Sequence, residues 1–512
     1  MAGVRSASSR MVDDVVCIVL LIALGLGVGL PRYRFGIDYS DEGCLAYGAV
    51  RVMEGQMPNR DFVTLQPPLS YYTAAAMFKL FGTSLASLRI LGLGIYVALP
   101  LLVYGITRKM AGPVWSLAAA IPSLFLGLAY FNFVPYAIWQ GIAATAVAVL
   151  LYMRAVEGAR RPWLALAAGV MTAASMLLRQ DQGLYLAFSI LLYTAVLWRT
   201  KAGLVSRAAL GRAFGLWLAG LAAGLLPFAV WWGVAGAWPE MFRQLVVFPL
   251  TTYPKTSALP FPAFRSRMPL AQNASAALCY LPPLVGILVA LWLWKQIRRN
   301  GCQWREARIV FILTWSAFFY CQALTRSDLH HLLIALVPFF ILCACGWNAV
   351  MEMLGDAQAG KTALSVLAAA IAVCFLWVTK PVFMEEQTPQ DMVDLHRAGV
   401  RMRGAGALAE FVRYVQGNAP ADRSILCLPY QPMYYFLCER RNPTRWNYLW
   451  PGDQTAEERR ALIEQARRDP PAVVLIFAEP DIGRFAPEIL DYVKAGYRKD
   501  AKDGWPSVYL PK

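Results

Sequence analysis

Long apolar segments alternate with short polar loops through the first 380 residues of the chain. Most of these segments approach the roughly 20 residues that a helix needs to cross a bilayer. The pattern predicts an α-helical polytopic membrane protein with about 11 transmembrane helices. We expect them at residues 15–30, 84–106, 113–131, 137–153, 163–178, 183–198, 213–234, 276–294, 308–324, 330–347 and 362–379.

The pattern changes after residue 380, where the chain becomes polar and charged. Short strand patterns alternate there with amphipathic helix patterns, which predicts a small extramembrane α/β domain. We therefore expect a transmembrane catalytic domain at residues 1–380 and an α/β domain at residues 381–512. The strands are expected at Ser424–Leu428 and Ala472–Phe477, and the helices at Leu408–Val415, Ala456–Arg467 and Ala486–Val493.

One polar stretch, Asp38–Tyr72, separates the first two predicted spans. It is too polar to cross a membrane and long for a connection, which favours a functional loop. Ser40 is placed to cap a short helix that Gly55 ends, so Asp41 and Glu42 fall in the first helical turn. We expect both carboxylates to point outward from the start of this helix.

A second short helix is expected from Leu69 to Phe81, after Pro67-Pro68 and before Gly82. About 13 residues cannot span a bilayer roughly 30 Å thick, so this helix is expected to lie along the membrane surface. The first external loop would then cover residues 31–83, carry two interfacial helices and form half of an active site.

Composition agrees with a membrane protein, because 58% of the residues are hydrophobic and only 16% are charged. Soluble domains have about 25% charged residues. The net charge of +16 does not indicate nucleic-acid binding, because many cations lie in short loops between the predicted spans. That distribution is the positive-inside pattern of membrane proteins.

The same pattern predicts the topology of the chain. With a cytoplasmic N-terminus, the cationic loops fall on the cytoplasmic side, and an odd number of spans places residues 381–512 on the external face with Asp41. We predict a multi-pass protein of the cytoplasmic (inner) membrane whose C-terminal domain is periplasmic or extracellular. The cytoplasmic cations would be Arg108, Lys109, Arg154, Arg160, Arg161, Arg199, Lys201, Arg207, Arg212, Lys295, Arg298, Arg299 and Arg305.

Ionisable side chains cluster at the predicted external ends of several spans, where such residues are candidates for function. Arg179 and Arg326 run against the positive-inside rule, which weakens the explanation that they only anchor the helices. The alternative is a local ion pair of Arg179 with Asp181, or of Arg326 with Asp328. The cluster comprises Arg179, Asp181, Arg326, Asp328, His330 and His331.

The loop Val234–Ser275 is rich in proline, and we expect it to be extended or turning. Lys255, Arg265 and Arg267 lie among aromatic residues in this loop. Arginine binds phosphate through two parallel hydrogen bonds, so these cations suit a lipid phosphate. The alternative is a solvated loop with ordinary surface charge.

Two cysteines, Cys427 and Cys438, fall in the predicted external domain. They could form a disulfide in an oxidising compartment. We favour the alternative, in which one is a buried strand residue and the other is free. The remaining cysteines show no metal-ligand spacing.

Transfer of a sugar from a phosphate carrier needs one carboxylate and several cations. The phosphate leaves as an anion, so it requires cationic stabilisation rather than a protonating acid. A single carboxylate can then act as general base on the acceptor hydroxyl. These two roles match residues in this chain: Asp41 could act as the base, and the cations could be Arg179, Arg326 and Arg265 or Arg267.

Asp41–Tyr72 contains the run DEG…Y…A…R…EG…P…RDF…PPL.YY, which resembles the first external loop of the GT-C membrane glycosyltransferases. The resemblance is strongest to the bacterial family 39-like branch, similar to protein O-mannosyltransferases and the aminoarabinose transferase of lipid A. Leu178–Gly183 and Arg326–Pro338 are also similar to that branch. The likeness covers the layout of residues 1–380 and is weak in the C-terminal domain.

The resemblance implies a polyprenyl-phosphate-linked sugar donor, transfer with inversion and an acidic residue of the first loop as catalytic base. By motif position this base is Asp41, with Glu42 as helper. Some members carry lysine where this chain has Gln66, so a donor-phosphate contact is missing here or is replaced by Lys255 or Arg265. Some relatives use a divalent cation, so Mg²⁺ or Mn²⁺ could bind at Asp41.

We therefore predict an integral membrane glycosyltransferase that moves a sugar to a glycolipid, polysaccharide or protein acceptor on the external face. One alternative is a transporter or flippase of lipid-linked saccharides, which predicts charges within the spans and inverted repeats. Another is a polysaccharide polymerase or ligase, for which we would expect a large charged loop later in the chain. Membrane lipids are expected partners and nucleic acid is not. The candidate substrate-binding residues are Asp181, Asp328, His330, His331, Gln66 and Tyr71.

Overall fold

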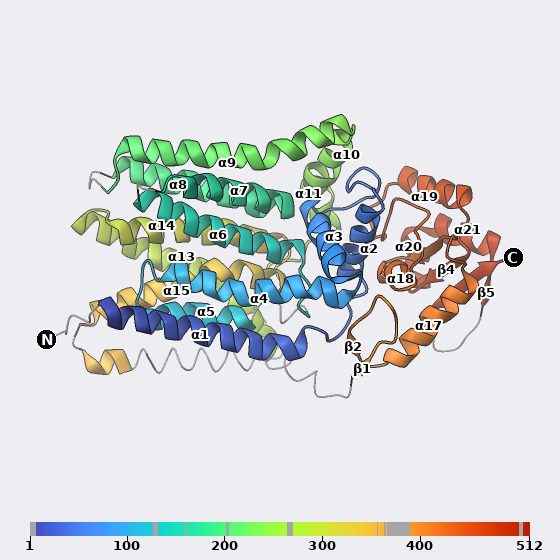
Figure 1. Cartoon of the computed structure of the whole chain (residues 1–512), viewed down its shortest axis with the longest axis horizontal. Helices are drawn as coiled ribbons and strands as arrows, with labels where there is room; N and C mark the ends of the chain where they lie inside the picture. The colour runs from blue at the N-terminus through green and yellow to red at the C-terminus, as the bar shows by residue number, and fades with distance from the viewer. Residues whose placement is uncertain are drawn as a thin grey trace. The chain divides into compact units, whose positions relative to one another are not determined.

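Contacts divide the chain into two compact units in the computed structural model (Figure 1). Unit 1 comprises Met1–Arg32, Leu93–Trp231 and Leu259–Glu385, and unit 2 comprises Tyr33–Gly92, Trp232–Ala258 and Glu386–Lys512. The structure describes residues 7–125, 132–158, 161–200, 204–263, 270–355, 357–362, 365, 390–500 and 505–512.

Unit 1 consists of long helices that run side by side in Figure 1. Eight helices of the described chain are long and apolar enough to cross a membrane, and two shorter apolar ones, α5 and α7, accompany them. The helices are α1 (Ala7–Arg32), α4 (Leu85–Thr107, which begins in unit 2), α5 (Pro113–Phe125), α6 (Ala137–Glu157), α7 (Trp163–Leu178), α8 (Gln180–Arg199), α9 (Arg207–Val234), α13 (Leu270–Asn300), α14 (Trp304–Thr325) and α15 (Leu329–Met353).

The predicted polytopic helical fold is confirmed. Each of the first ten expected spans corresponds to one of these apolar helices, with ends that differ by a few residues. The expected span at 362–379 lies almost wholly outside the described residues.

Glycine permits close helix packing within unit 1. A Cβ atom on Gly169 of α7 would lie 2.1 Å from the carbonyl oxygen of Trp217 in α9, and one on Gly220 of α9 would lie 2.0 Å from that of Leu166. Small residues let helix backbones approach where lipid provides no hydrophobic drive for association. The absence of side chains at these two positions therefore lets α7 and α9 meet backbone to backbone.

Unit 2 contains a mixed four-stranded sheet with the order β3-β4-β6-β5. β3 and β4 are parallel, and the other pairs are antiparallel. The predicted α/β domain is confirmed, including the two expected strands and three expected helices; β5 and β6 were not predicted. The elements are α17 (Ala405–Asn418), β3 (Ile425–Leu428), α18 (Met433–Leu437), α19 (Ala456–Arg468), β4 (Val473–Ile476), α20 (Glu479–Phe485), α21 (Pro487–Gly496), β5 (Tyr497–Asp500) and β6 (Ser507–Pro511).

The first loop belongs to unit 2 together with the C-terminal segment, whereas the sequence pattern assigned it to the transmembrane domain. It contains α2 (Asp41–Met53) and α3 (Leu69–Phe81), at the predicted positions. Tyr47 of α2 stacks on Tyr435 of α18 with ring centroids 4.9 Å apart. A two-stranded ribbon, β1 (Asp391–Met392) and β2 (Arg401–Met402), also lies in this unit.

The proline-rich segment of unit 2 is largely helical, so the expectation of an extended or turning loop is wrong for residues 238–256. Pro239, Pro249 and Pro254 occupy the first positions of short helices, where a missing N–H removes no helical bond. The segment contains α10 (Trp238–Phe242), the π-helical turn η1 (Arg243–Val247), α11 (Phe248–Thr251) and α12 (Tyr253–Thr256).

Cys427 and Cys438 are both buried free thiols. Cys427 lies on β3, an edge strand of the sheet, and Cys438 follows α18 directly. The favoured expectation of a buried strand cysteine without a disulfide therefore agrees with the structure.

Candidate active site

Asp38 caps the helix on which the predicted base lies. Its Oδ1 accepts hydrogen bonds from the backbone N–H groups of Ser40, at 2.9 Å, and Asp41, at 3.3 Å. Ser40 occupies the predicted N-cap position, but its side chain makes no capping hydrogen bond. The prediction that Ser40 caps the helix through its side chain is wrong, because the carboxylate two residues earlier serves these N–H groups instead.

Glu42 points into the protein and is completely buried. Nε of Arg89 donates to Oε1 of Glu42 at 2.6 Å, and Nη2 of Arg89 donates to Oε2 at 2.7 Å. A buried carboxylate requires a cation and well-placed hydrogen bonds, and Arg89 supplies both. The expectation that both carboxylates point outward is therefore wrong for Glu42, whereas Asp41 is exposed.

Arg89 also organises the chain that leads into α2. It donates to the carbonyl oxygens of Phe35, at 2.7 Å, and Gly36, at 2.9 Å, while Oε2 of Glu42 accepts from the N–H of Asp38 at 3.2 Å. Burial raises the pKa of Glu42, and the Arg89 guanidinium offsets part of this rise. Sequence reasoning missed Arg89, although an arginine in the first turns of a predicted span was an available signal.

The surroundings of Asp41 include two phenols, the buried Tyr71 and the half-buried Tyr448. Loss of solvent around each ring raises the pKa of both tyrosines, and the nearby charge of Asp41 raises both further. Both groups therefore stay protonated near neutral pH and can donate hydrogen bonds. The structure brings Tyr71 and Asp41 into electrostatic reach of each other, as predicted for one site, and adds Tyr448, which sequence reasoning missed.

Tyr71 and Gln66 both contact Thr64. The Tyr71 hydroxyl lies 2.6 Å from Oγ1 of Thr64, and the backbone N–H of Gln66 donates to the same oxygen at 3.1 Å. Tyr71 is 3% exposed and Gln66 is half-buried. Through Thr64, Tyr71 stabilises the loop before α3. A substrate contact through Tyr71 or Gln66 stays a prediction.

Arg179 and Asp181 form the local ion pair considered as an alternative, with Nε 3.0 Å from Oδ1. Arg179 joins α7 to α8 in extended conformation, and Asp181 lies in the first turn of α8. The pair is partly exposed, so it contributes at most about 1 kcal/mol to stability. Its exposure leaves Arg179 able to interact with a ligand as well.

Arg326 follows the end of α14 in unit 1, where Leu259 pairs with it by backbone bridging. Its Nε is buried, and within the described ranges it has no hydrogen-bond partner. An unsatisfied buried guanidinium nitrogen is costly, so such a group is a candidate for ligand binding. Arg326 is therefore a candidate in this unit for binding an anionic ligand.

Asp328 caps α15, since its Oδ1 accepts from the backbone N–H of His331 at 2.9 Å and lies 2.7 Å from Nδ1 of the same residue. His331 lies within electrostatic reach of Arg326 and Arg179. The structure thus places Arg179, Arg326, Asp328 and His331 near one another in unit 1, and a shared role in a ligand site stays a prediction.

Lys255 is the one further predicted phosphate-binding cation whose position lies in the described part of the chain. Lys255 is exposed on α12 in unit 2. Arg265, Arg267 and the side chain of His330 lie outside the described residues.

The described residues do not assemble a complete set of protein ligands for a metal ion. Within the described ranges, no group of three or more His, Cys, Asp or Glu side chains is placed to hold one. Oδ1 of Asp38, three residues before Asp41, already accepts two N–H groups, and both oxygens of the adjacent Glu42 accept from Arg89. A divalent cation at Asp41 stays a prediction.

No protein-family model matches the sequence, and no curated protein sequence matches it. Solved structures match its fold. The archaeal oligosaccharyltransferase AglB from Archaeoglobus fulgidus, in complex with an inhibitory peptide and a dolichol-phosphate, aligns with a TM-score of 0.58 at 12% identity, over 98% of this chain and 74% of that one. ArnT from Cupriavidus metallidurans bound to undecaprenyl phosphate aligns with a TM-score of 0.53 at 14% identity, over 98% of both chains.

The arabinofuranosyltransferase AftD from Mycobacteria also aligns, with a TM-score of 0.51 at 12% identity, over 97% of this chain and 39% of that one. These neighbours have the GT-C fold of membrane glycosyltransferases. The chain therefore has the GT-C fold, and the resemblance of Asp41–Tyr72 is confirmed at the level of the fold.

Proposed function

We propose that this protein is an integral membrane glycosyltransferase that takes its sugar from a polyprenyl-phosphate carrier. The shared fold supports the proposal, because AglB was solved with a dolichol-phosphate and ArnT with undecaprenyl phosphate. At 12–14% identity these likenesses establish the fold alone. The proposed activity is therefore argued from the site, and above all from the exposed Asp41 next to Glu42, whose carboxylate is paired with Arg89.

Asp41 serves as general base in this proposal. Its neighbour Glu42 cannot take a proton from a substrate, because its oxygens accept hydrogen bonds from Arg89 and the N–H of Asp38 inside the protein. Glu42 is thus a positioning residue rather than a catalytic helper. One exposed carboxylate is what the reaction needs, since a phosphate leaving group requires no protonating acid.

The chemical step is a displacement at the sugar's anomeric carbon. The acceptor hydroxyl gives its proton to Asp41, and its oxygen forms the new bond to that carbon. The bond to the phosphate oxygen breaks, and its electron pair leaves with the phosphate. Attack opposite the leaving group inverts the configuration. We assign stabilisation of the phosphate to Arg326 and Arg179, with Lys255, Arg265 and Arg267 as further candidate contacts.

The finer assignments extend the sequence predictions. We propose that transfer occurs on the external face of the cytoplasmic membrane, to a glycolipid, polysaccharide or protein. The apolar helices of unit 1 support a multi-pass membrane protein. These helices do not indicate on which side of the membrane transfer occurs, so the external face is inferred from the positive-inside rule.

The test is an assay of the purified full-length chain in lipid nanodiscs. Undecaprenyl-phosphate-linked arabinose, mannose, galactose and glucose are each supplied with a cell-envelope extract as acceptor. We expect one donor to be consumed, with free undecaprenyl phosphate released in equal amount to transferred sugar. Consumption of none of them, or donor translocation across a vesicle without cleavage, would overturn the proposal.

A further inference from the structure

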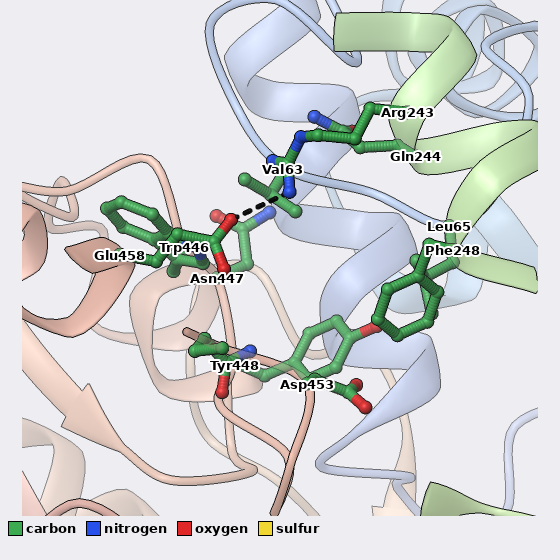
Figure 2. Close-up of a pocket in the computed structure, with 11 residues that line it drawn as sticks. Val63, Leu65, Arg243, Gln244, Phe248, Trp446, Asn447, Tyr448, Asp453 and Glu458 are labelled. Atoms are coloured by element: carbon green, nitrogen blue, oxygen red, sulfur yellow. Dashed lines mark ion pairs between the residues drawn. The ribbon is translucent and has the colours of Figure 1, made fainter. Parts of the chain in front are cut away.

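A cleft lies within unit 2, between the first loop, the 238–256 segment and the loop before α19 (Figure 2). Its cavity volume is about 30 Å³, which is room for one or two water molecules and so for a hydroxyl or hydroxymethyl group rather than a whole sugar ring. The cleft is partly open to solvent, so a ring-shaped ligand would lie partly outside it.

Aromatic side chains form part of the wall. Trp446 is almost fully buried, whereas Tyr448 and Phe248 are half-buried. Figure 2 shows the Tyr448 ring extending from its loop toward Phe248. Flat apolar faces with a polar tip suit a ligand that has both C–H surfaces and hydroxyl groups.

Polar groups of both signs share the same cleft. Arg243 pairs with Glu458 at 2.9 Å, the ion pair drawn in Figure 2. Oδ1 of Asp453 accepts from the Thr256 hydroxyl at 3.1 Å. Thr256 is the only hydrogen-bond partner of the Asp453 side chain in the described part of the chain, so the other carboxylate oxygen can accept from a ligand. The set suits an uncharged, hydroxyl-rich molecule, because its fixed charges already form one pair.

Tyr448 connects this cleft to the proposed base. The charges of Asp453 and of Asp41 both act on its hydroxyl, so it lies within electrostatic reach of each. The wall of the cleft also contacts the helix of the proposed base, because Oδ1 of Asn447 accepts from Nη1 of Arg51 on α2 at 2.8 Å. A ligand in the cleft therefore lies beside the helix that begins with Asp41, which suits the acceptor rather than the leaving phosphate.

We infer that this cleft is the acceptor subsite and that the acceptor is a saccharide, bound by Tyr448, Phe248 and Asp453. The role of this saccharide as acceptor rests on the proposed transferase activity. Saccharide binding at the cleft does not depend on that activity.

A peptide acceptor fits the cleft less well. Extended peptides bind mainly through backbone hydrogen bonds to open N–H and C=O groups. Here the N–H of Val63 donates to the carbonyl oxygen of Arg445 at 2.9 Å, and the N–H of Thr64 donates to Oε1 of Gln244 at 3.0 Å. These two backbone donors of the wall are occupied, so recognition there falls to side chains, as suits a polyol.

The experiment is saturation-transfer NMR on the full-length chain in nanodiscs, with the methyl glycosides of glucose, galactose, mannose and arabinose as probes. We expect saturation of the ring protons of at least one glycoside. Asp453→Asn should weaken that binding roughly ten-fold, because a charged acceptor is lost while the shape is kept. Asp481→Asn, at a partly exposed position on α20, is the matched control and should bind as wild type.

Two further measurements separate this inference from the proposed function. Asp41→Asn should retain glycoside binding even though it loses transfer, and Asp453→Asn should raise the acceptor KM with little change in kcat. Binding without any transfer would refute the transferase and leave the saccharide site. Absence of saturation for all four glycosides in the wild-type protein, or displacement of a bound glycoside by the peptide Ala-Ser-Thr-Ala, would overturn the saccharide assignment.

Discussion

Arg89 and Glu42 form a doubly hydrogen-bonded ion pair with no solvent exposure on either side chain. The pair joins the first turns of α4 to the first turn of α2. Because Arg89 also holds the carbonyl groups of Phe35 and Gly36, it fixes the chain that brings Asp38 to the start of α2. The exposed Asp41 thus depends for its position on an ion pair that never meets solvent.

Arg89→Ala should strongly destabilise the protein. Removal of one partner of a buried pair leaves an uncompensated charge, which costs about 3–5 kcal/mol. Arg60 offers a matched control, because it also pairs with a carboxylate, Asp61 at 2.7 Å, but is 42% exposed. Arg60→Ala should cost less than about 1 kcal/mol. Thermal unfolding in detergent compares the two, and equal losses would show that the buried pair does not stabilise α2.

Gly43→Ala should disrupt the packing of α2 on α18. An added Cβ would lie 2.4 Å from the backbone nitrogen of Met433, and backbone cannot move aside as a flexible side chain can. We expect a loss of roughly 1–3 kcal/mol in stability, with reduced transfer activity. Gly406→Ala in α17, where nothing lies within 4 Å, should be neutral or slightly stabilising. If the two variants melt alike, the close approach of α2 and α18 is wrong.

Arg326→Lys should weaken donor binding. Lysine keeps the charge but cannot make the two parallel hydrogen bonds that a guanidinium makes to phosphate. We expect the KM for the lipid-linked donor to rise about ten-fold, with a smaller effect on kcat, as for loss of a charged hydrogen bond. Arg298→Lys is the control, because Arg298 stacks on Trp294 at the end of α13. An unchanged donor KM in Arg326→Lys would remove Arg326 from the phosphate site.

Acceptor use should depend on pH through Asp453. Burial raises its pKa to about 6, the nearby charge of Glu458 adds to this, and the hydrogen bond from Thr256 opposes it. Below pH 6 the carboxylate gains a proton and loses acceptor capacity, so the acceptor KM should rise and then level off about ten-fold higher, as in Asp453→Asn. The facing Tyr448 stays protonated throughout. A KM–pH profile of wild type and Asp453→Asn checks this, because the variant should lack the inflection.

The same group predicts the sign of a stability change. The folded pKa of Asp453 lies above its unfolded value of 3.8, so folding takes up a proton between these pH values. This contribution stabilises the fold at low pH and is lost as the pH rises through about 6. From pH 4 to 6, the unfolding temperature of Asp453→Asn should therefore rise more, or fall less, than that of the wild type. A variant that gains less stability than the wild type over this range would contradict the raised pKa.

Local signals were sufficient to predict most of the fold. Apolar segment length identified the helices of unit 1, and the stops at Gly55 and Gly82 coincide with the ends of α2 and α3. These features depend on a few neighbouring residues, so they can be read without tertiary contacts. The prolines of the 238–256 segment misled because the same residue opens a helix as readily as it breaks one.

The parts that sequence reasoning missed depend on contacts between distant residues. Glu42 is buried because Arg89 meets it 47 residues later, and nothing near Glu42 in the chain indicates that pairing. Tyr448 and Asp453 join the site only through the folding of the C-terminal segment onto the first loop. The pattern of apolar and polar residues along the sequence therefore could not predict which polar side chains become buried by tertiary contacts.

The most direct test of the account is the single-turnover rate of Asp41→Asn with the lipid-linked donor and saturating acceptor. Asparagine keeps the shape of the side chain but cannot accept the proton, so transfer should fall by about 10²–10⁴-fold. Donor affinity and glycoside binding should stay within two-fold of wild type. A transfer rate near that of the wild-type protein would contradict the assignment of Asp41 as the catalytic base.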